Sequence, residues 1–248
     1  MAVLLAALSA CATVPAPPGA AAPPKPSRVD PWERFNRRVF AFNEAVDDAA
    51  LRPLAELYRR RLPEVVREGV GNFFANLRDA WSVANLFLQG KPQTGAPMAF
   101  RVVTNSVFGL GGLFDLATPL GMPRQSEDFG QTLAVWGVRQ GPYLVLPLLG
   151  PSTLRDTAAL PLDRYATSPV RFIEDANTLL LTPLEVVHVR AELLSATRLA
   201  GEVSLDKYLF VRDAFLSRRL DQVHDGAPPL VPMDTDDYDD SPQPTSRQ

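Results

Sequence analysis

Histidine and cysteine are almost missing from this chain, whose 248 residues include two histidines and one cysteine. One cysteine permits no disulfide within the chain. A structural zinc site needs a cluster of several Cys or His ligands. The sequence therefore predicts no metal centre of that kind.

The short motifs of common enzymes are missing as well. The sequence has no G-x-S-x-G turn for a serine nucleophile. It has no G-x-x-x-x-G-K-[ST] or G-x-G-x-x-G loop for a nucleotide phosphate. The acidic pair Glu127 and Asp128 is explained by the start of a helix, whose N-terminus favours negative charge. We therefore expect a protein that is not an enzyme and has no cofactor.

A strongly basic region is also absent. The formal net charge is −3. Residues 226–248 contain five aspartates and one arginine, a net charge of −4, so the rest of the chain carries +1. A nucleic-acid-binding surface needs a concentrated basic field, so no nucleic-acid partner is expected. Because residues 226–248 offer little to bury, we expect an acidic disordered tail there.

Residues 1–10 have the pattern of a bacterial lipoprotein signal peptide. The apolar block Val3–Leu8 leads into Leu8-Ser9-Ala10-Cys11, in which an aliphatic residue and two small residues precede cysteine. Lipoproteins are cut before such a cysteine, which is then acylated, so Cys11 is the predicted lipidation site. The alternative is an ordinary thiol beside a chance Leu-Ser-Ala. No Lys or Arg precedes Cys11, as a signal peptide would normally have, and we expect the true start to lie upstream.

Residues 11–29 are predicted to tether this anchor to the folded domain. The segment is rich in Pro and Ala and has no apolar periodicity, which is typical of an extended, semi-rigid linker. Ala12 rather than Asp follows the cysteine, which in enteric-type sorting favours the outer membrane.

Residues 30–225 are predicted to form one all-α domain of many short amphipathic helices. Asp30-Pro31-Trp32-Glu33 is a helix start, with Asp30 as the N-cap. A stripe at three- and four-residue steps follows, and it favours a core-facing side. Its members are Trp32, Phe35, Val39, Phe42 and Val46.

The remaining helices are placed by the same periodicity. Gly69 and Gly71 predict a bend or break in the helix over 64–89, and Pro183 interrupts or restarts a late helix. No stretch alternates convincingly with period two, so no strand is expected. The other predicted helices are 97–107, one from Ser126, one from Ser152 to about Tyr165, one from Ser168, and 206–220.

The segment from Phe129 to Pro151 contains Arg139 as its only charged residue. Gly137, Gly141, Pro142 and Pro147 interrupt it, so it cannot form one spanning helix. It is either a buried core loop or a bent apolar element that contacts lipid. The candidates for a lipid-contacting belt are Tyr143, Leu144, Val145, Leu146, Leu148 and Leu149.

A series of motifs gives this sequence its resemblance to a known family. The series runs in order through Asp30-Pro-Trp-Glu-Arg-Phe-Asn-Arg37, Phe40-Ala-Phe-Asn43, Arg52-Pro53, Asn72-Phe-Phe-Ala-Asn-Leu77, Asn85-Leu-Phe-Leu-Gln-Gly90, Asn105-Ser-Val-Phe-Gly-Leu-Gly-Gly-Leu-Phe-Asp115, Glu127-Asp-Phe-Gly-Gln-Thr-Leu133, Trp136-Gly-Val138, Gly141-Pro-Tyr143, Leu154-Arg-Asp156, Asp206-Lys-Tyr208 and Val211-Arg212. It resembles the MlaA (VacJ) family of outer-membrane lipoproteins from about Asp30 to Leu220. Arg34 and Ala80 stand where the common family form has Gly and Pro, which leaves the local bend near Ala80 open.

The resemblance implies a ring of helices with a central channel, lying in the inner leaflet of the outer membrane. Such proteins associate with trimeric porins and remove phospholipid misplaced in the outer leaflet. They pass it to a soluble periplasmic carrier, which feeds an inner-membrane ABC transporter and so keeps the membrane asymmetric. The best-matched segment supplies Phe40, Phe42 and Asn43 as candidates for the channel and its gating.

The physics of the sequence agrees with this implied function. A lipid head group loses hydration in a bilayer, and each CH₂ of its tails exposed to water costs about 0.8 kcal/mol. An apolar belt outside and a polar lining inside would meet both requirements without covalent chemistry. Two alternatives remain open, namely an envelope scaffold lipoprotein that moves no lipid and a lipid-modifying hydrolase.

Overall fold

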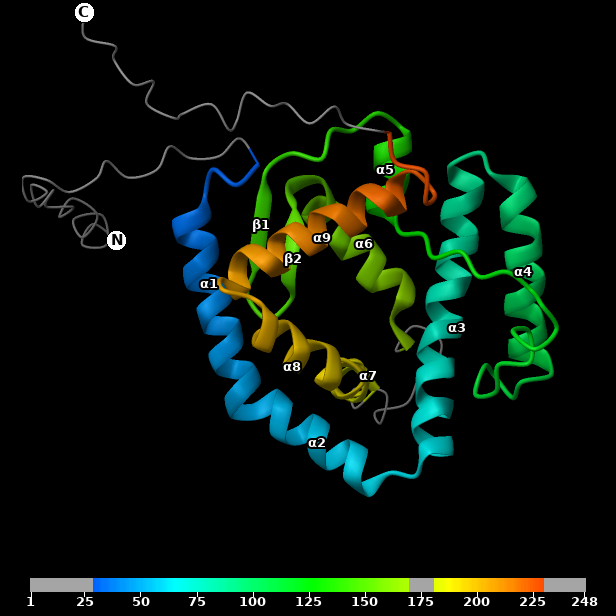
Figure 1. Ribbon diagram of the computed structural model, residues 1–248. Helices are drawn as coiled ribbons and strands as arrows, with labels where there is room; N and C mark the ends of the chain where they lie inside the picture. Colours follow the sequence, from blue (N-terminus) through cyan, green and yellow to red (C-terminus); the bar gives the residue numbers. More distant parts are fainter. Residues whose placement is uncertain (1–28, 170–180, 230–248) are drawn as a thin grey trace, which may run out of the picture.

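The computed structural model describes residues 29–169 and 181–229. Within these residues the regular secondary structure is helical apart from one β-hairpin (Figure 1). The elements are α1 (Glu33–Val46), the π-helix η1 (Asp47–Leu51), α2 (Arg52–Arg61), α3 (Glu64–Leu88), α4 (Pro92–Val107), α5 (Phe129–Val135), β1 (Tyr143–Leu146), β2 (Gly150–Thr153), α6 (Leu154–Thr167), α7 (Leu181–Glu192), α8 (Leu194–Val203) and α9 (Lys207–Val223). The predicted all-α fold of a single domain is confirmed.

The helices are arranged as a ring. Figure 1 shows α1, η1 and α2 following one another along the left and lower edges, with α3 rising on the right and α4 outside it. The chain turns from α2 into α3 at Leu62–Pro63, where the residue before proline is extended. Helices α6, α8 and α9 lie within this frame, and α9 runs across it toward α5.

Helix α3 differs from its prediction, because it runs unbroken for 25 residues. Of the two glycines expected to bend it, Gly71 instead allows a close contact. A Cβ on Gly71 would lie 2.8 Å from Nε2 of His188, and one on Gly69 would lie 3.7 Å from the carbonyl oxygen of Leu113. The small size of Gly71 therefore serves packing against α7, whereas a side chain on Gly69 would make only an ordinary contact with the loop after α4.

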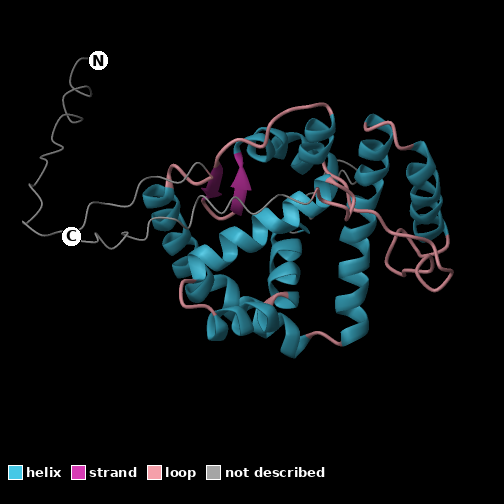
Figure 2. Cartoon of the chain, turned by 45° about the horizontal axis from the view of Figure 1, so that its top comes forward, coloured by secondary structure: helices cyan, strands magenta, loops and turns pink. Residues whose placement is uncertain are grey.

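The β-hairpin also differs from the prediction of no strand and of a bent helix or loop over Phe129–Pro151. After the short helix α5, β1 pairs antiparallel with β2, and Tyr143 lies opposite Thr153 (Figure 2). Each strand has only four residues. An apolar run this short shows no period that distinguishes a strand from a buried helix segment.

Several helix starts lie near their predicted positions but use other residues. Helix α1 has Trp32 as its N-cap instead of Asp30, whose buried carboxylate accepts hydrogen bonds from Asn36 and Tyr208. Helix α4 starts at Pro92 and contains Pro97. Helix α9 starts as predicted, since Asp206 accepts the backbone N–H groups of Tyr208 and Leu209.

Two further N-caps are shifted by one or two residues. Helix α5 is capped by Asp128 instead of Ser126, and helix α6 by Thr153 instead of Ser152. The helix predicted from Ser168 runs into residues 170–180, which lie outside the described residues.

Candidate lipid-facing surface and polar interior

The outward face of α1 is apolar. The aromatic stripe predicted to lie in the core is largely exposed, with about half of the surface of Trp32, Phe35 and Phe42 open. The residue that α1 buries is Asn36. The prediction of a core-facing stripe is wrong for these three aromatics, because α1 docks through Asn36 and through Val39, the stripe member that packs against the core.

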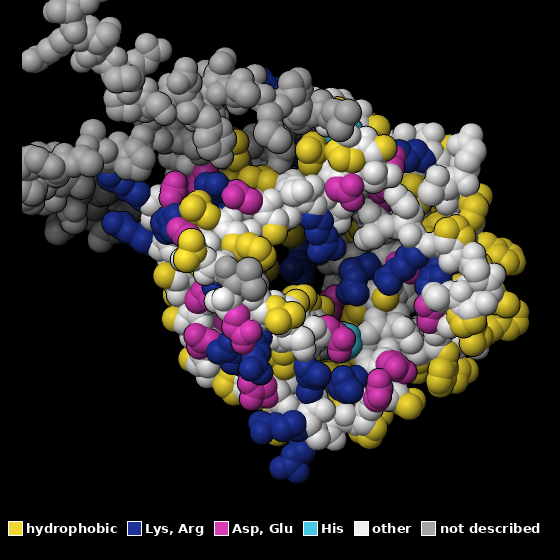
Figure 3. All heavy atoms as spheres, in the orientation of Figure 1, with side chains coloured by type: hydrophobic (Ala, Val, Ile, Leu, Met, Phe, Trp, Pro, Cys, Tyr) yellow, Lys and Arg dark blue, Asp and Glu magenta, His cyan; other side chains and the backbone are white. Residues whose placement is uncertain are grey.

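The hairpin of α3 and α4 also buries polar residues and exposes many apolar ones; we call this arrangement the inversion of the fold. Its buried side carries Asn76, Asp79, Ser82 and Asn85 beside a few apolar residues such as Phe74, whereas many of its other apolar residues are exposed. Figure 3 shows hydrophobic side chains gathered along the right edge, where α4 and the following loop lie. The exposed residues of this region are Val65, Val66, Phe87, Leu88, Phe100, Val103, Val107, Phe108, Leu110, Leu113, Phe114, Leu116 and Leu120. Exposed apolar area on this scale marks contact with a partner or a membrane.

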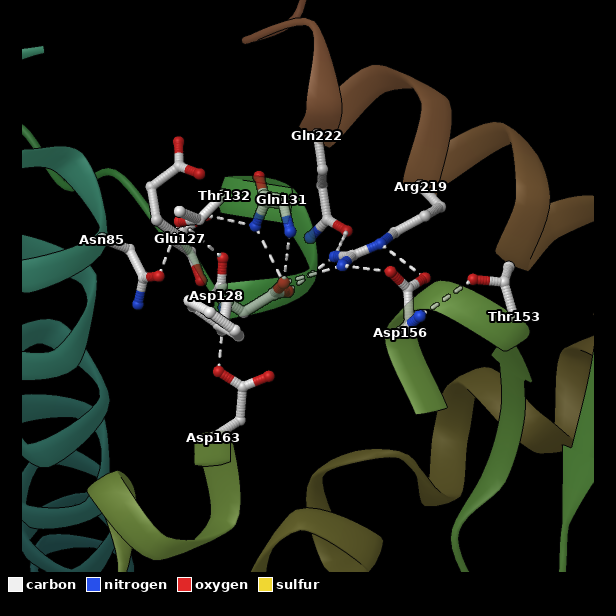
Figure 4. Close-up of polar contacts among 12 residues, drawn as sticks. Asn85, Glu127, Asp128, Gln131, Thr132, Thr153, Asp156, Asp163, Arg219 and Gln222 are labelled. Atoms are coloured by element: carbon white, nitrogen blue, oxygen red, sulfur yellow. Dashed lines mark hydrogen bonds and ion pairs between the residues drawn. The ribbon is translucent and has the colours of Figure 1, made fainter. Parts of the chain in front are cut away.

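The interior is held together by charges. The Arg219 guanidinium on α9 lies between two carboxylates, Asp128 before α5 and Asp156 on α6 (Figure 4). Its Nη atoms bond Asp128 at 2.5 and 2.7 Å, while Nε and Nη2 bond Asp156 at 2.9 Å. Arginine is suited to such paired contacts because its planar fork matches a carboxylate. This triad joins three elements of the ring.

The charge of Arg219 favours the ionised form of the Asp128 carboxylate. Burial alone would raise the pKa of Asp128, but hydrogen bonds and charge from Arg219 lower it. Gly130 lies against the triad, since a Cβ there would be 2.5 Å from both Arg219 Nη2 and Asp156 Oδ1. No side chain larger than hydrogen fits at this position without moving the ion pairs.

A second polar cluster fastens the loop after α4 to the α3–α4 hairpin. Arg101, with a side chain 3% exposed, bonds Asp115 at 2.8 Å and the hydroxyl of Thr118 at 2.9 Å. Burial opposes the charge of Asp115, but hydrogen bonds from Thr118 and Asn105 and the charge of Arg101 prevail. They lower the pKa of Asp115 to about 2. The loop is therefore anchored from within, while its apolar side chains face outward.

Two asparagines on α1 hold the free edge of β1. Asn36 donates from Nδ2 to the carbonyl oxygen of Tyr143 and accepts the N–H of Val145. Asn43, two helical turns later, donates to the carbonyl of Leu146 at 2.9 Å. Each amide presents a donor and an acceptor, as a neighbouring strand would. Side-chain amides of α1 thus take the place of a neighbouring strand along this edge of β1.

The face seen in Figure 3 is hollowed near its centre, between the positions that α6, α8 and α9 occupy in Figure 1. Lys and Arg side chains lie in and around the hollow. Within residues 29–169 and 181–229, no helix combines the length and hydrophobicity needed to cross a bilayer. Over the same residues, no group of three or more Asp, Glu, His or Cys is placed to hold a metal ion.

The family assignment comes from the sequence as a whole. A family model described as MlaA lipoprotein matches residues 28–222, which include all but the last residue of the elements described above. This chain belongs to the MlaA lipoprotein family.

Named members of the MlaA family are similar over most of the chain. The intermembrane phospholipid transport system lipoprotein MlaA of Shigella flexneri is 35% identical over 77% of each chain. The Escherichia coli K12 protein of the same name is 34% identical over 77% of each. A solved structure described as the structural basis for maintenance of bacterial outer membrane lipid asymmetry has a TM-score of 0.68 and 33% identity. It covers 81% of this chain and 100% of that one.

The three channel candidates face different ways in this MlaA-family fold. Asn43 points inward to the hairpin. Phe40 packs edge-on against Tyr208 with 5.6 Å between ring centroids, beside the small core of Tyr143 and Val145. Phe42 is exposed with the outer stripe. Of these three candidates, Asn43 and Phe40 contact the interior and Phe42 does not. Cys11 lies outside the described residues.

The belt candidates are divided by strand alternation. Tyr143 and Val145 are each 1% exposed, so they lie in the core and the prediction that they contact lipid is wrong. Leu144 and Leu146 point to the other face and are half-buried. The turn residues Leu148 and Leu149 are largely exposed and remain candidates for lipid contact. Successive residues of a strand point to opposite faces of the sheet. The prediction of a helix or loop did not separate the candidates into a buried set and an outward set.

Sequence reasoning missed the interior ion pairs. Arg219 was not a candidate, and Asp156 appeared only within a family motif. The pairs Arg219–Asp128 and Arg219–Asp156 join residues 91 and 63 positions apart. One sequence contains no signal that pairs charges at such separations.

Proposed function

We propose that this protein is an outer-membrane lipoprotein that removes misplaced phospholipid from the outer leaflet and so maintains lipid asymmetry. The printed names of the Shigella and Escherichia relatives and the subject of the similar solved structure support this function. The structural observation that carries the proposal is the inversion of the fold. Many apolar side chains are exposed on the outside of the ring, while amides and ion pairs are buried inside it beside two small apolar clusters.

The inversion suits a protein that lies in one leaflet without crossing the membrane. Lipid tails would contact the aromatic stripe of α1 and the outer face of α3 and α4. Phospholipid head groups would follow a polar route through the hollow, because a zwitterionic or anionic head group is costly to strip of water. A backbone in helices suits this setting, since its hydrogen bonds are satisfied internally.

The anchor and partners complete the proposal. Acyl chains on Cys11 would hold the protein in the inner leaflet of the outer membrane, and residues 12–29 would tether the ring. A trimeric porin would hold the ring in position, and a soluble periplasmic carrier would receive the lipid and pass it to an inner-membrane ABC transporter. The protein would act without catalysis or a cofactor.

The envelope scaffold and the lipid-modifying hydrolase are the competing functions. Full-length acylated protein in liposomes separates the three. Release of labelled phospholipid to an added periplasmic carrier, without lysophospholipid or fatty acid, supports transport. Breakdown products identify a hydrolase, and porin capture with no lipid release identifies a scaffold.

A deletion strain provides the cellular test. It should accumulate phospholipid in the outer leaflet, and the intact gene should reverse this. A normal outer leaflet in the deletion strain contradicts the proposed function. Intact-mass analysis of mature protein tests the anchor separately, since an unmodified Cys11 contradicts lipidation.

A further inference from the structure

The last turn of α2 carries three consecutive arginines, Arg59, Arg60 and Arg61. All three are exposed. Arg60 has an ion pair with Glu56 at 3.9 Å, and its Nε donates to the Glu56 carbonyl. Neither Arg59 nor Arg61 has an ion-pair partner among the described residues. Figure 3 shows Lys and Arg side chains projecting at the lower edge, where α2 runs toward α3 in Figure 1.

Helix stability explains only part of this cluster. A cation in the last turn interacts favourably with the helix dipole, and Arg60 already contacts a carbonyl of its own helix. Two more unpaired arginines beside it repel one another and gain little from the same dipole. The acidic residues nearby do not balance them, since Glu56 is turned to Arg60 and Glu64 lies in the first turn of α3.

Exposed aliphatic side chains lie along the chain on both sides of these arginines. Leu54 and Leu57 on α2 and Val65 and Val66 on α3 are each about half exposed or more. The neighbouring face of α2, which carries Ala55 and Tyr58, is the one that packs in the protein. Basic heads beside exposed aliphatic groups are typical of a helix at the boundary between lipid head groups and acyl chains.

We propose that this corner, residues 54–66, binds anionic phospholipid head groups, with Arg59 and Arg61 as the phosphate contacts. The inference rests on the proposed membrane location and adds a lipid class to it. A guanidinium can bond two phosphate oxygens at once, and a basic residue near an anionic leaflet favours binding about fivefold. The adjacent leucines and valines would enter the acyl boundary and hold this side of the ring at a fixed depth.

The test uses full-length protein with Cys11→Ser, so that acyl chains do not mask weak binding. Flotation is measured with vesicles of phosphatidylcholine alone and of phosphatidylcholine mixed equally with phosphatidylglycerol. The test variant is Arg59→Gln/Arg61→Gln. The matched control is Arg164→Gln/Arg218→Gln, which removes from α6 and α9 two exposed charges that have no ion-pair partner among the described residues. Melting temperatures are recorded for all.

The parent should bind the anionic vesicles more tightly, and high salt should reduce this preference because it shortens the Debye length. The test variant should lose about 25-fold of the anionic binding, about fivefold for each charge, and keep its binding to phosphatidylcholine. The control variant should lose much less.

Equal losses in the test and control variants would overturn the proposal, because net charge would then explain the effect. An unchanged test variant would also overturn it, as would loss accompanied by a large drop in melting temperature. Unchanged flotation together with lost function in cells would assign the corner to an acidic protein partner instead. A parent that floats with neither vesicle contradicts the proposed membrane location, whereas equal binding to both vesicles contradicts this inference alone.

Discussion

The Asn43 side chain closes the β-hairpin turn, because its Oδ1 accepts the backbone N–H of Leu148 at 2.7 Å while its Nδ2 donates to the Leu146 carbonyl. Leu148 has a φ of 63°, a left-handed conformation that is unusual for leucine. A side chain on the first helix therefore holds a strained turn 105 residues later.

Replacing this amide should loosen the turn. We expect Asn43→Ala to destabilise the protein by about 1–3 kcal/mol, because two backbone groups lose their partners. The amide of Leu148 should exchange with solvent faster, while amides in α3 keep their protection. Asn43→Gln is the control for amide chemistry without the correct reach. Unchanged exchange at Leu148 in Asn43→Ala would contradict the role of this contact.

Deletions along the α1–α2 rod should differ according to their place. A deletion within an α-helix turns the following residues by about 100°, but η1 has an extra residue per turn that a deletion can remove. We expect deletion of Ala49, inside η1, to convert the π-turn to α-helix with little loss of melting temperature.

Deletion of Asn43 removes the hairpin contact even if η1 restores the register of α2. We expect it to misgate lipid passage and to be dominant over wild type in outer-leaflet phospholipid assays. A recessive, null-like effect at normal protein level argues against gating.

The buried triad gives a pair of adjacent arginines as test and control. Arg219→Met leaves Asp128 and Asp156 without their shared cation and should cost about 3–5 kcal/mol, as removal of one partner from a buried ion pair does. Arg218→Met changes an exposed neighbour and should alter stability by less than about 0.5 kcal/mol. Urea unfolding measures both. Similar midpoints for the two variants would show that the triad is not a major support of the ring.

His188 should make stability depend on pH. Burial lowers its pKa from the ordinary 6.5, and the Arg67 and Arg78 charges act in the same direction, against those of Glu192 and Glu185. Tyr58 lies 3.1 Å from Nδ1. The unfolded chain then binds the proton at higher pH than the folded chain. The contribution is fully present above pH 6.5 and is lost as the pH falls through the lowered pKa. Melting temperature should therefore fall on acidification below 6.5, and by less in His188→Gln. Parallel profiles for both proteins would contradict this assignment.

The hairpin separates core from lipid-facing positions. Val145→Asp should unfold the protein, since it buries a carboxylate without a partner. Leu148→Asp should leave the melting temperature nearly unchanged, because Leu148 is 64% exposed and Asp tolerates positive φ better than Leu. It should nevertheless weaken flotation of the Cys11→Ser protein with phosphatidylcholine vesicles. Normal flotation of Leu148→Asp would exclude the turn from the membrane surface.

Much of the local structure follows from the sequence, because its causes lie within a few residues of one another. The Asp206 cap and the three- and four-residue stripes both depend on neighbours within a turn or two. The pattern before Cys11 is local as well, and the lipidation and the tether drawn from it stay predictions. The shortage of charge from Phe129 to Pro151 was also visible, although its division into helix, loop and hairpin was not.

Tertiary structure decided which face of each helix is inside. Periodicity shows that α1 is amphipathic, but the same stripe fits a protein core or a lipid surface, since both accept apolar side chains. The choice depended on Asn36 and Asn43 reaching β1 more than a hundred residues away, and on Arg219 meeting Asp128 and Asp156. These contacts turn the polar sides of the helices inward. They exist only when distant segments are brought together, because nothing in the residues next to Asn36 or Arg219 specifies a partner.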